Sequence, residues 1–325
     1  MLLQPRWDST SFDLAKARIS NGIRRSSIDP TYLASNGLYK LILGSENILA
    51  TDARGTIGSV TAMTMDNLKA YYEKNVSPSV SQFLVVGAVD QARVEKALEN
   101  LTQNWAGKEV VMPALTFAKG PEKPSVYFID IPGAKQSNIY IGCLAIPRGN
   151  PDYYPAFVAN YKLGGSFNGY VNLVLREEKG YTYGSRTNFS GQKNYGAFVA
   201  NAPVRSTATL ESTEILRDLM IKYRQGISQE DVDFTKNALL KGNALKYETQ
   251  GALLDMLNTM AFYGLPADYI TRDENYVRSL TPAEVDAQVQ KYIDPMKMYY
   301  VIAGDAATQL KELKKLGFGE PVLIK

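Results

Sequence analysis

Arg176 and Tyr183 are a cation and a phenol whose types and spacing could support chemistry at one site. They lie in the segment 175–184 (LREEKGYTYG), where an amphipathic helix is expected to end at Gly180 and a strand to begin. Ser166 can cap this helix, and its buried face is expected to consist of Phe167, Tyr170, Val171, Val174 and Leu175. Arg176 points off that face. It can therefore meet Tyr183 across the turn, where a carbonyl oxygen or a peptide backbone could bind.

Both residues also have purely structural explanations. An arginine near the C-terminus of a helix is favourable because of the helix dipole. Tyrosine is common in strands, and Tyr181 and Tyr183 are expected to share one face of a strand while Gly184 leaves the other face open. The local pattern alone leaves a functional and a structural interpretation open.

The chain contains no histidine, which limits the chemistry that it can perform alone. Ser-His-Asp triads, Cys-His dyads and His-containing zinc sites are excluded. The single cysteine, Cys143, lies in an apolar run and is expected to be a buried core thiol. Catalysis by this chain alone would rest on carboxylates, Lys, Arg or Tyr. A net charge of +3 gives no support for nucleic acid or an anionic membrane as a partner, and no apolar run approaches the length of a membrane span.

The hydrophobic periodicity predicts an α+β chain. Helices are expected over 8–25, 32–43, 65–74, 90–101, 152–163, 207–225, 229–248, 251–263, 268–276 and 281–292, with a short helix from Ala306. Strands are expected over 82–86, 125–130, 136–145, 181–190, 195–203 and 298–303, and a loop over 45–60. Residues 106–123 lack periodicity and contain prolines, which is typical of a linker.

Two parts of the chain repeat the same order of elements at an offset of 217 residues. Thr64, a helix, a proline stop and a strand ending at Gly87 match Thr281, a helix, a proline stop and a strand ending at Gly304. We therefore predict two homologous domains, each a mainly antiparallel sheet covered by helices. The prediction comprises a first domain over 1–105 that is truncated at its N-terminus, a linker over 106–123, and a complete second domain over 124–325.

Four short motifs resemble the pitrilysin and mitochondrial-processing-peptidase family of zinc metallopeptidases. They are PGAKQS at 132–137, DYY at 152–154, LGGSF at 163–167 and LREEKGYTY at 175–183. The resemblance extends over nearly the whole chain and is most specific over 163–184. The chain looks most like the second, zinc-free half of a bacterial member.

The resemblance implies two homologous halves that close around an unfolded peptide. One half carries an H-x-x-E-H zinc motif, whose Glu activates a zinc-bound water. The other half supplies an Arg and, seven residues later, a Tyr, a spacing that Arg176 and Tyr183 have here. By resemblance, Arg176 would hold the substrate backbone and the Tyr183 hydroxyl would donate to the oxyanion. No metal ligand or cofactor site is assigned to this chain, and Glu177 and Glu178 are interpreted as surface carboxylates.

Two functions remain as alternatives. The chain is the peptide-binding half of a metallopeptidase, with zinc in a complementary half that is fused to it or is a separate subunit. Alternatively, it is a non-catalytic scaffold or core-type subunit of the same fold, as the missing histidine suggests. In either case the isolated chain is expected neither to bind zinc nor to cleave peptide. The resemblance to a bacterial member suggests a periplasmic or cell-envelope location.

Overall fold

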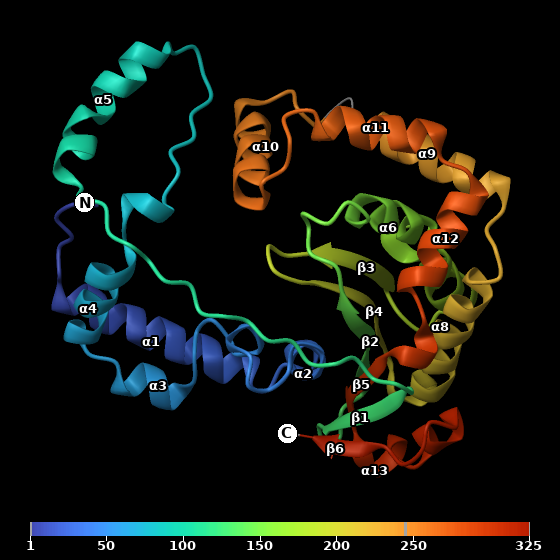
Figure 1. Ribbon diagram of the computed structural model, residues 1–325. Helices are drawn as coiled ribbons and strands as arrows, with labels where there is room; N and C mark the ends of the chain where they lie inside the picture. Colours follow the sequence, from blue (N-terminus) through green and yellow to red (C-terminus); the bar gives the residue numbers. More distant parts are fainter. Residues whose placement is uncertain (1, 244–245, 325) are drawn as a thin grey trace.

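The computed structural model describes residues 2–243 and 246–324, and its centre is a six-stranded mixed sheet (Figure 1). The strand order is β3-β4-β2-β5-β1-β6. Neighbouring strands are antiparallel from β3 to β5, and β1 is parallel to both β5 and β6. The strands are β1 (Ser125–Asp130), β2 (Gln136–Ala145), β3 (Arg186–Gly191), β4 (Gly196–Arg205), β5 (Tyr299–Gly304) and β6 (Val322–Ile324). The α+β class is confirmed, and the sheet is mixed where a mainly antiparallel one was predicted.

The helices fall close to the predicted ranges. They are α1 (Ser9–Ser26), α2 (Pro30–Leu43), α3 (Ile57–Ala62), α4 (Met65–Asn75), α5 (Gln91–Asn104), α6 (Tyr153–Asn160), α7 (Tyr170–Asn172), α8 (Thr209–Tyr223), α9 (Gln229–Asn243), α10 (Gln250–Tyr263), α11 (Tyr269–Ser279), α12 (Pro282–Tyr292) and α13 (Ala306–Gln309). The helix predicted over 229–248 includes positions 244–245, which lie outside the described residues. The loop predicted over 45–60 contains a 3-10 turn (Ile48–Ala50) and the start of α3. No helix within the described ranges is long and apolar enough to cross a membrane.

One face of the sheet carries the larger hydrophobic core, beneath α6, α8 and α12. Alternate residues of a strand point to opposite faces, so Tyr300 and Ile302 of β5 enter this core while Val301 and Ala303 face the other side. Leu216 of α8 and Val289 of α12 close the core from above and are buried. The segment that leads to Arg176 and Tyr183 packs in this same layer of helices.

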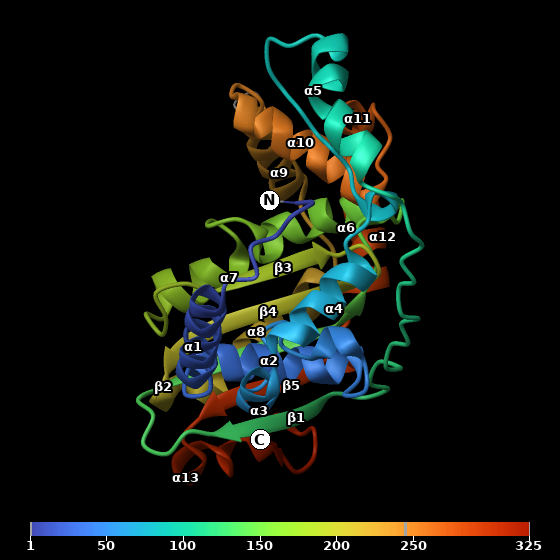
Figure 2. The ribbon, with the colours of Figure 1, turned by 90° about the vertical axis from the view of Figure 1, so that its left-hand side faces the viewer.

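The opposite face of the sheet is covered by α2, which runs across β2 and β5 (Figure 2). Its buried face, which includes Leu38 and Ile42, packs on Val301 and Ala303. The helix can approach closely because Gly37 faces the sheet, where an added Cβ would lie 3.1 Å from Cδ1 of Ile129. The sheet of the second predicted domain is thus covered in part by a helix from residues 1–105. The predicted domain boundaries themselves stay a prediction.

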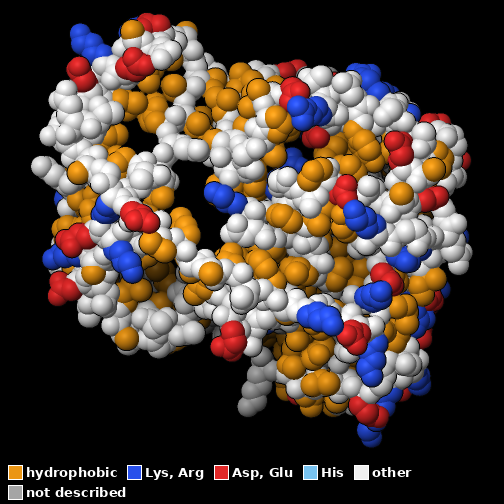
Figure 3. Space-filling view, viewed as in Figure 1, with side chains coloured by type: hydrophobic (Ala, Val, Ile, Leu, Met, Phe, Trp, Pro, Cys, Tyr) orange, Lys and Arg blue, Asp and Glu red, His pale blue; other side chains and the backbone are white. Residues whose placement is uncertain are grey.

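The strand predicted over 82–86 does not form, and this prediction was wrong. Residues 2–105 contain helices and turns but no strand, so the sheet predicted for the first domain is not present in them. Phe83 is 60% exposed and Val85 43% exposed, and hydrophobic side chains reach the surface in this part of the molecule (Figure 3). The physical reason is that an extended segment becomes a strand only when neighbours pair with its backbone groups. Nothing in residues 2–105 supplies those neighbours.

Candidate functional site

The segment that leads to Arg176 and Tyr183 departs from regular α-helix twice. α6 continues as a π-helical turn over Tyr161–Gly165, and α7 continues as a second one over Leu173–Glu178. Such turns frequently occur at functional sites. The single helix predicted after Ser166 therefore begins later, at Tyr170, and Gly169 occupies its N-cap position without a side-chain cap. Gly180 ends the segment at φ 62°, as predicted.

The buried stripe of this segment is largely as predicted, with one exception that matters for the site. Val171 and Leu175 are fully buried. Phe167 is instead 51% exposed, because it precedes the helix and lies outside its apolar face. Gly164 packs tightly behind it, since an added Cβ would lie 2.6 Å from Oγ1 of Thr187. Gly164 is therefore packed closely against Thr187 of β3.

Arg176 lies at the edge of the buried stripe, and its side chain is 35% exposed. Its guanidinium lies 4.6 Å from the centroid of the Phe167 ring, and Arg186 approaches the same ring at 5.3 Å. Its Nε lies 3.5 Å from the carboxylate of Glu177. Cation–π contacts of this kind hold a guanidinium without using up its hydrogen-bond donors. Arg176 is thus positioned by Phe167 and keeps donors available for a ligand.

Tyr183 is the most exposed large side chain in this region, at 92%. The backbone around it is held in place. The Thr182 hydroxyl donates to the carbonyl of Gly184 at 2.9 Å and accepts from the amide of Gly184 at 3.1 Å. The side chain therefore projects from a fixed turn, with its hydroxyl free to donate. Within the described residues, no hydrogen bond or ion pair joins Tyr183 to Arg176.

Tyr181 and Tyr183 do not share one face of a strand, so that prediction was wrong. The strand begins at Arg186. The Tyr181 hydroxyl donates to the Glu211 carboxylate at 2.6 Å, whereas Tyr183 faces solvent. The backbone amide of Ser185 donates to a side chain rather than to a neighbouring strand, which keeps residues 181–185 out of the sheet.

Asn172 is the side chain that fixes this loop, and the sequence analysis did not single it out. It is 1% exposed, and its amide nitrogen donates to the carbonyl of Phe167 at 2.8 Å. Its amide oxygen accepts from the backbone amide of Ser185 at 3.0 Å. One buried amide therefore ties the residue that supports Arg176 to the loop that carries Tyr183. A polar residue in an otherwise apolar helix face was the available signal, since buried polar groups require partners.

A largely buried charged cluster lies behind the segment and was also not predicted. Lys162 lies 3.5 Å from Asp231, and the hydroxyls of Tyr170 and Ser228 donate to the same carboxylate at 2.6 and 2.7 Å. Burial opposes ionisation of Asp231, but the hydrogen bonds from Tyr170 and Ser228 and the charge of Lys162 lower its pKa below the usual value. This cluster connects the first π-helical turn to the start of α9, and so fixes the back of the site.

A second polar group flanks the loop at the surface. Glu211 accepts from the Tyr181 hydroxyl and from Lys179, whose Nζ lies 2.9 Å away. The hydrogen bond from Tyr181 and that from Lys179 lower the pKa of the Glu211 carboxyl. Arg205 lies 4.7 Å over the ring of Tyr181. Two cations, Lys179 and Arg205, therefore lie near the loop, and a cation near the loop suits the binding of a carbonyl or a developing negative charge.

The part of the chain that the structure describes contains no zinc site. The sequence has no histidine, and no group of three or more Cys, Asp or Glu suited to a metal occurs in residues 2–243 and 246–324. Burial raises the pKa of the Cys143 thiol to about 12, which disfavours the thiolate that a metal would bind. No step of a reaction is therefore derived through zinc held by this chain.

The chain belongs to a known family. Residues 62–239 match the family described as peptidase M16 inactive domain, so the chain is a member of that family. The resemblance inferred from the motifs is thereby confirmed. Among curated proteins, it is 24% identical over 314 residues to the non-peptidase homolog YmxG of Helicobacter pylori. It is also 22% identical over 250 residues to the uncharacterized zinc protease SCO5738 of Streptomyces coelicolor and 23% over 254 residues to the uncharacterized zinc protease YmxG of Bacillus subtilis.

The matched proteins are longer than this chain. The three alignments cover 94%, 75% and 75% of the chain but 70%, 54% and 58% of these relatives. Among solved structures, a peptidase M16 inactive domain from Pseudomonas fluorescens superposes with a TM-score of 0.84 at 24% identity, covering 93% of this chain and 72% of that one. A protease from Helicobacter pylori superposes with a TM-score of 0.81 at 13% identity, covering 91% and 72%. At these identities the likeness shows the fold.

Proposed function

We propose that this chain is the substrate-binding half of a zinc-dependent metalloendopeptidase, which holds the peptide while a complementary half supplies zinc. The observation that carries the proposal is the geometry of Tyr183. Its hydroxyl is exposed, and its backbone is held by the Thr182 turn. An exposed phenol on a fixed turn is suited to donate to an oxyanion formed on a substrate that a second half presents.

Arg176 has a different role in this proposal. Its contact with Phe167 fixes the guanidinium beside the loop, and its free donors can bind the carbonyl oxygens of an extended peptide. Asn172 acts as a positioning residue because it connects the Phe167 carbonyl to Ser185. The peptide would therefore lie across the turn between Arg176 and Tyr183.

The test replaces Tyr183→Phe in the complete enzyme, with the complementary half present. Loss of one oxyanion donor should lower kcat by about 10²–10³-fold with little change in KM. The matched control is Tyr71→Phe, which removes a hydroxyl from another exposed tyrosine, on α4. Unchanged turnover in the Tyr183 variant would refute the role given to this residue.

A non-catalytic scaffold of the same fold is the second candidate. It is supported by the absence of histidine from the sequence and by the name of the Helicobacter pylori relative, a non-peptidase homolog. The discriminating observation is the sequence encoded upstream of Met1 and in neighbouring genes. An H-x-x-E-H motif there supports the peptidase half, and its absence from both supports the scaffold. Stoichiometric zinc in the purified chain would contradict both candidates.

We also propose that residues 1–105 are part of a domain homologous to 124–325, with 106–123 as the linker between them. The element bounds support this. α4 and α12 occupy 65–75 and 282–292, at the same offset of 217 that the sequence repeat has. The 3-10 turns that follow them, at 78–80 and 295–297, keep this offset. The proposal implies that the extended segment 82–86 acquires neighbouring strands from a polypeptide outside residues 2–105.

A further inference from the structure

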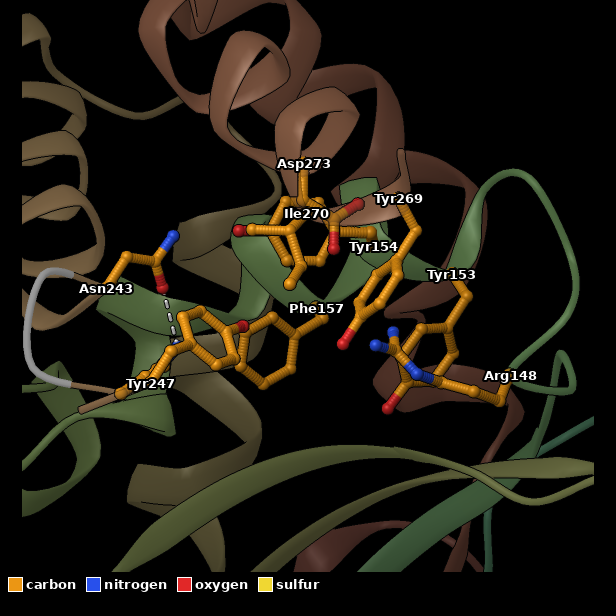
Figure 4. Close-up of a pocket in the computed structure, with 10 residues that line it drawn as sticks. Arg148, Tyr153, Tyr154, Phe157, Asn243, Tyr247, Tyr269, Ile270 and Asp273 are labelled. Atoms are coloured by element: carbon orange, nitrogen blue, oxygen red, sulfur yellow. Dashed lines mark hydrogen bonds between the residues drawn. The ribbon is translucent and has the colours of Figure 1, made fainter. Parts of the chain in front are cut away.

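A cavity of about 310 Å³ lies between α6, the chain that follows α9, and α11, away from Arg176 and Tyr183 (Figure 4). Five of the ten residues that line it are aromatic, namely Tyr153, Tyr154, Phe157, Tyr247 and Tyr269. The faces of aromatic rings carry partial negative charge, so a wall of this composition attracts cations. Neither the family match nor the proposed oxyanion role accounts for it.

One carboxylate faces this aromatic wall. Asp273 of α11 points into the cavity between Tyr154 and Tyr269 (Figure 4). Its carboxylate is partly removed from water, and it forms no hydrogen bond or ion pair with the residues that the structure describes. A half-buried carboxylate without a partner is costly to keep ionised. Its capacity to accept hydrogen bonds is therefore available to a ligand.

Two cations also line the cavity, and each contacts another residue of the wall. The guanidinium of Arg148 lies 4.6 Å from the centroid of the Tyr153 ring. Lys246 donates from Nζ to the amide oxygen of Asn243 at 2.8 Å. Neither forms an ion pair with Asp273 among the described residues, and both keep their positive charges. A ligand cation that reaches Asp273 would be attracted by its carboxylate and by the ring faces, while the charges of Arg148 and Lys246 act against it.

We propose that this cavity binds the cationic side chain of an arginine or lysine of a peptide, by an ion pair with Asp273 and contact with the rings of Tyr154 and Tyr269. A second cavity of about 390 Å³ adjoins it and shares Arg148, Tyr154, Tyr269 and Asp273. This gives room for the residues that flank the bound side chain. The choice of a peptide rests on the proposed peptide-binding function, whereas the cation site itself does not.

Binding should depend on pH through Asp273. Burial raises the pKa of this carboxyl to about 6, while the charges of Arg148 and Lys246 oppose that rise. The other titratable groups facing it are the hydroxyls of Tyr154, Tyr247 and Tyr269, and burial raises their pKa values further above neutrality. Because only the carboxylate form pairs with a cation, affinity should be full above pH 7 and should fall as the pH decreases through about 6.

The experiment is calorimetric titration of the 325-residue chain with three blocked tripeptides, acetyl-Ala-X-Ala-amide, in which X is arginine, norleucine or glutamate. The arginine peptide should bind at least about tenfold more tightly than the other two. Asp273→Asn should weaken its binding by about tenfold or more. The control Asp255→Asn removes an exposed carboxylate of α10 and should leave binding unchanged. Equal affinity for the three peptides, or no effect of Asp273→Asn, overturns the proposal.

Arg148→Gln provides an independent variant, because it removes a like charge from the cavity wall. It should tighten binding of the arginine peptide, and unchanged or weaker binding would overturn the proposal. These titrations contain no complementary half and measure no turnover. Failure of the cation site would therefore leave the Tyr183→Phe result standing, and loss of the oxyanion role would leave the cation site standing.

Discussion

Two stretches of the chain, residues 64–87 and 281–304, begin with the same elements and end differently. α4 and α12 each start at a threonine, Thr64 or Thr281, whose side chain and partner at the third helical position form a capping box. Each helix is followed by a 3-10 turn with proline in its first position. After the second turn the chain becomes β5, which pairs with both β1 and β2. After the first turn the chain remains extended and unpaired.

The difference shows which parts of the repeat are encoded locally. Capping boxes and proline turns involve residues within a few positions of one another, so they form in both copies. A strand requires backbone partners from elsewhere in the chain. β1 and β2 supply these partners to β5 from residues 125–145, and residues 2–105 contain no strand that could do so for 82–86.

Hydrogen exchange tests the difference most directly. Amides of 299–304 should exchange at least about 10³-fold more slowly than those of 82–86, because the former open only with the sheet and the latter are already exposed. The measurement is hydrogen–deuterium exchange followed by peptide mass spectrometry on dilute protein. Similar protection in both segments would show that 82–86 is paired in solution and would contradict the comparison.

Substitutions at equivalent positions of the two segments should change the free energy of unfolding by different amounts. Ile302 is fully buried, and Val85, 217 residues earlier, is 43% exposed. Ile302→Ala should lower the free energy of unfolding by about 2–5 kcal/mol, since it leaves a cavity in the core beneath α12. Val85→Ala should change it by less than about 0.5 kcal/mol.

Urea unfolding followed by far-UV circular dichroism measures both effects. The m-values should remain similar, so that midpoints can be compared. A decrease of several kcal/mol in the free energy of unfolding of the Val85 variant would mean that this side chain is buried in solution. That result would contradict its exposure in the structure.

The contrast between locally encoded elements and elements that need distant partners also explains how much of the fold could be predicted from sequence. The bounds of β1 and β2 agree with prediction, because continuous apolar runs between turn residues define them. The segment 82–86 has the same apolar pattern, and the prediction failed there because a pattern reports a preference for burial without supplying a partner. β6 was missed because it is only three residues long, so its apolar run is too short to indicate a strand.

At the candidate site, Arg176 and Tyr183 were proposed from the sequence, but the contacts that hold them were not predicted. The position of Arg176 off the buried face follows from helical periodicity, and the structure agrees. The strand predicted from Tyr181 failed because side chains replace the backbone ladder. Asn172 binds the amide of Ser185, and Thr182 closes its own turn. Such contacts depend on three-dimensional packing, and periodicity does not encode them.

The capping boxes offer the smallest and most specific test of the comparison. Thr281→Ala removes the acceptor for the Glu284 amide at the start of α12, which buries Val285 and Val289 in the core. It should therefore lower the global free energy of unfolding by about 1 kcal/mol. Thr64→Ala breaks the same contact in α4, which has no buried residue, so it should accelerate amide exchange in α4 while global stability stays nearly unchanged. Equal global effects of the two substitutions would show that α4 is packed against a core in solution, as α12 is.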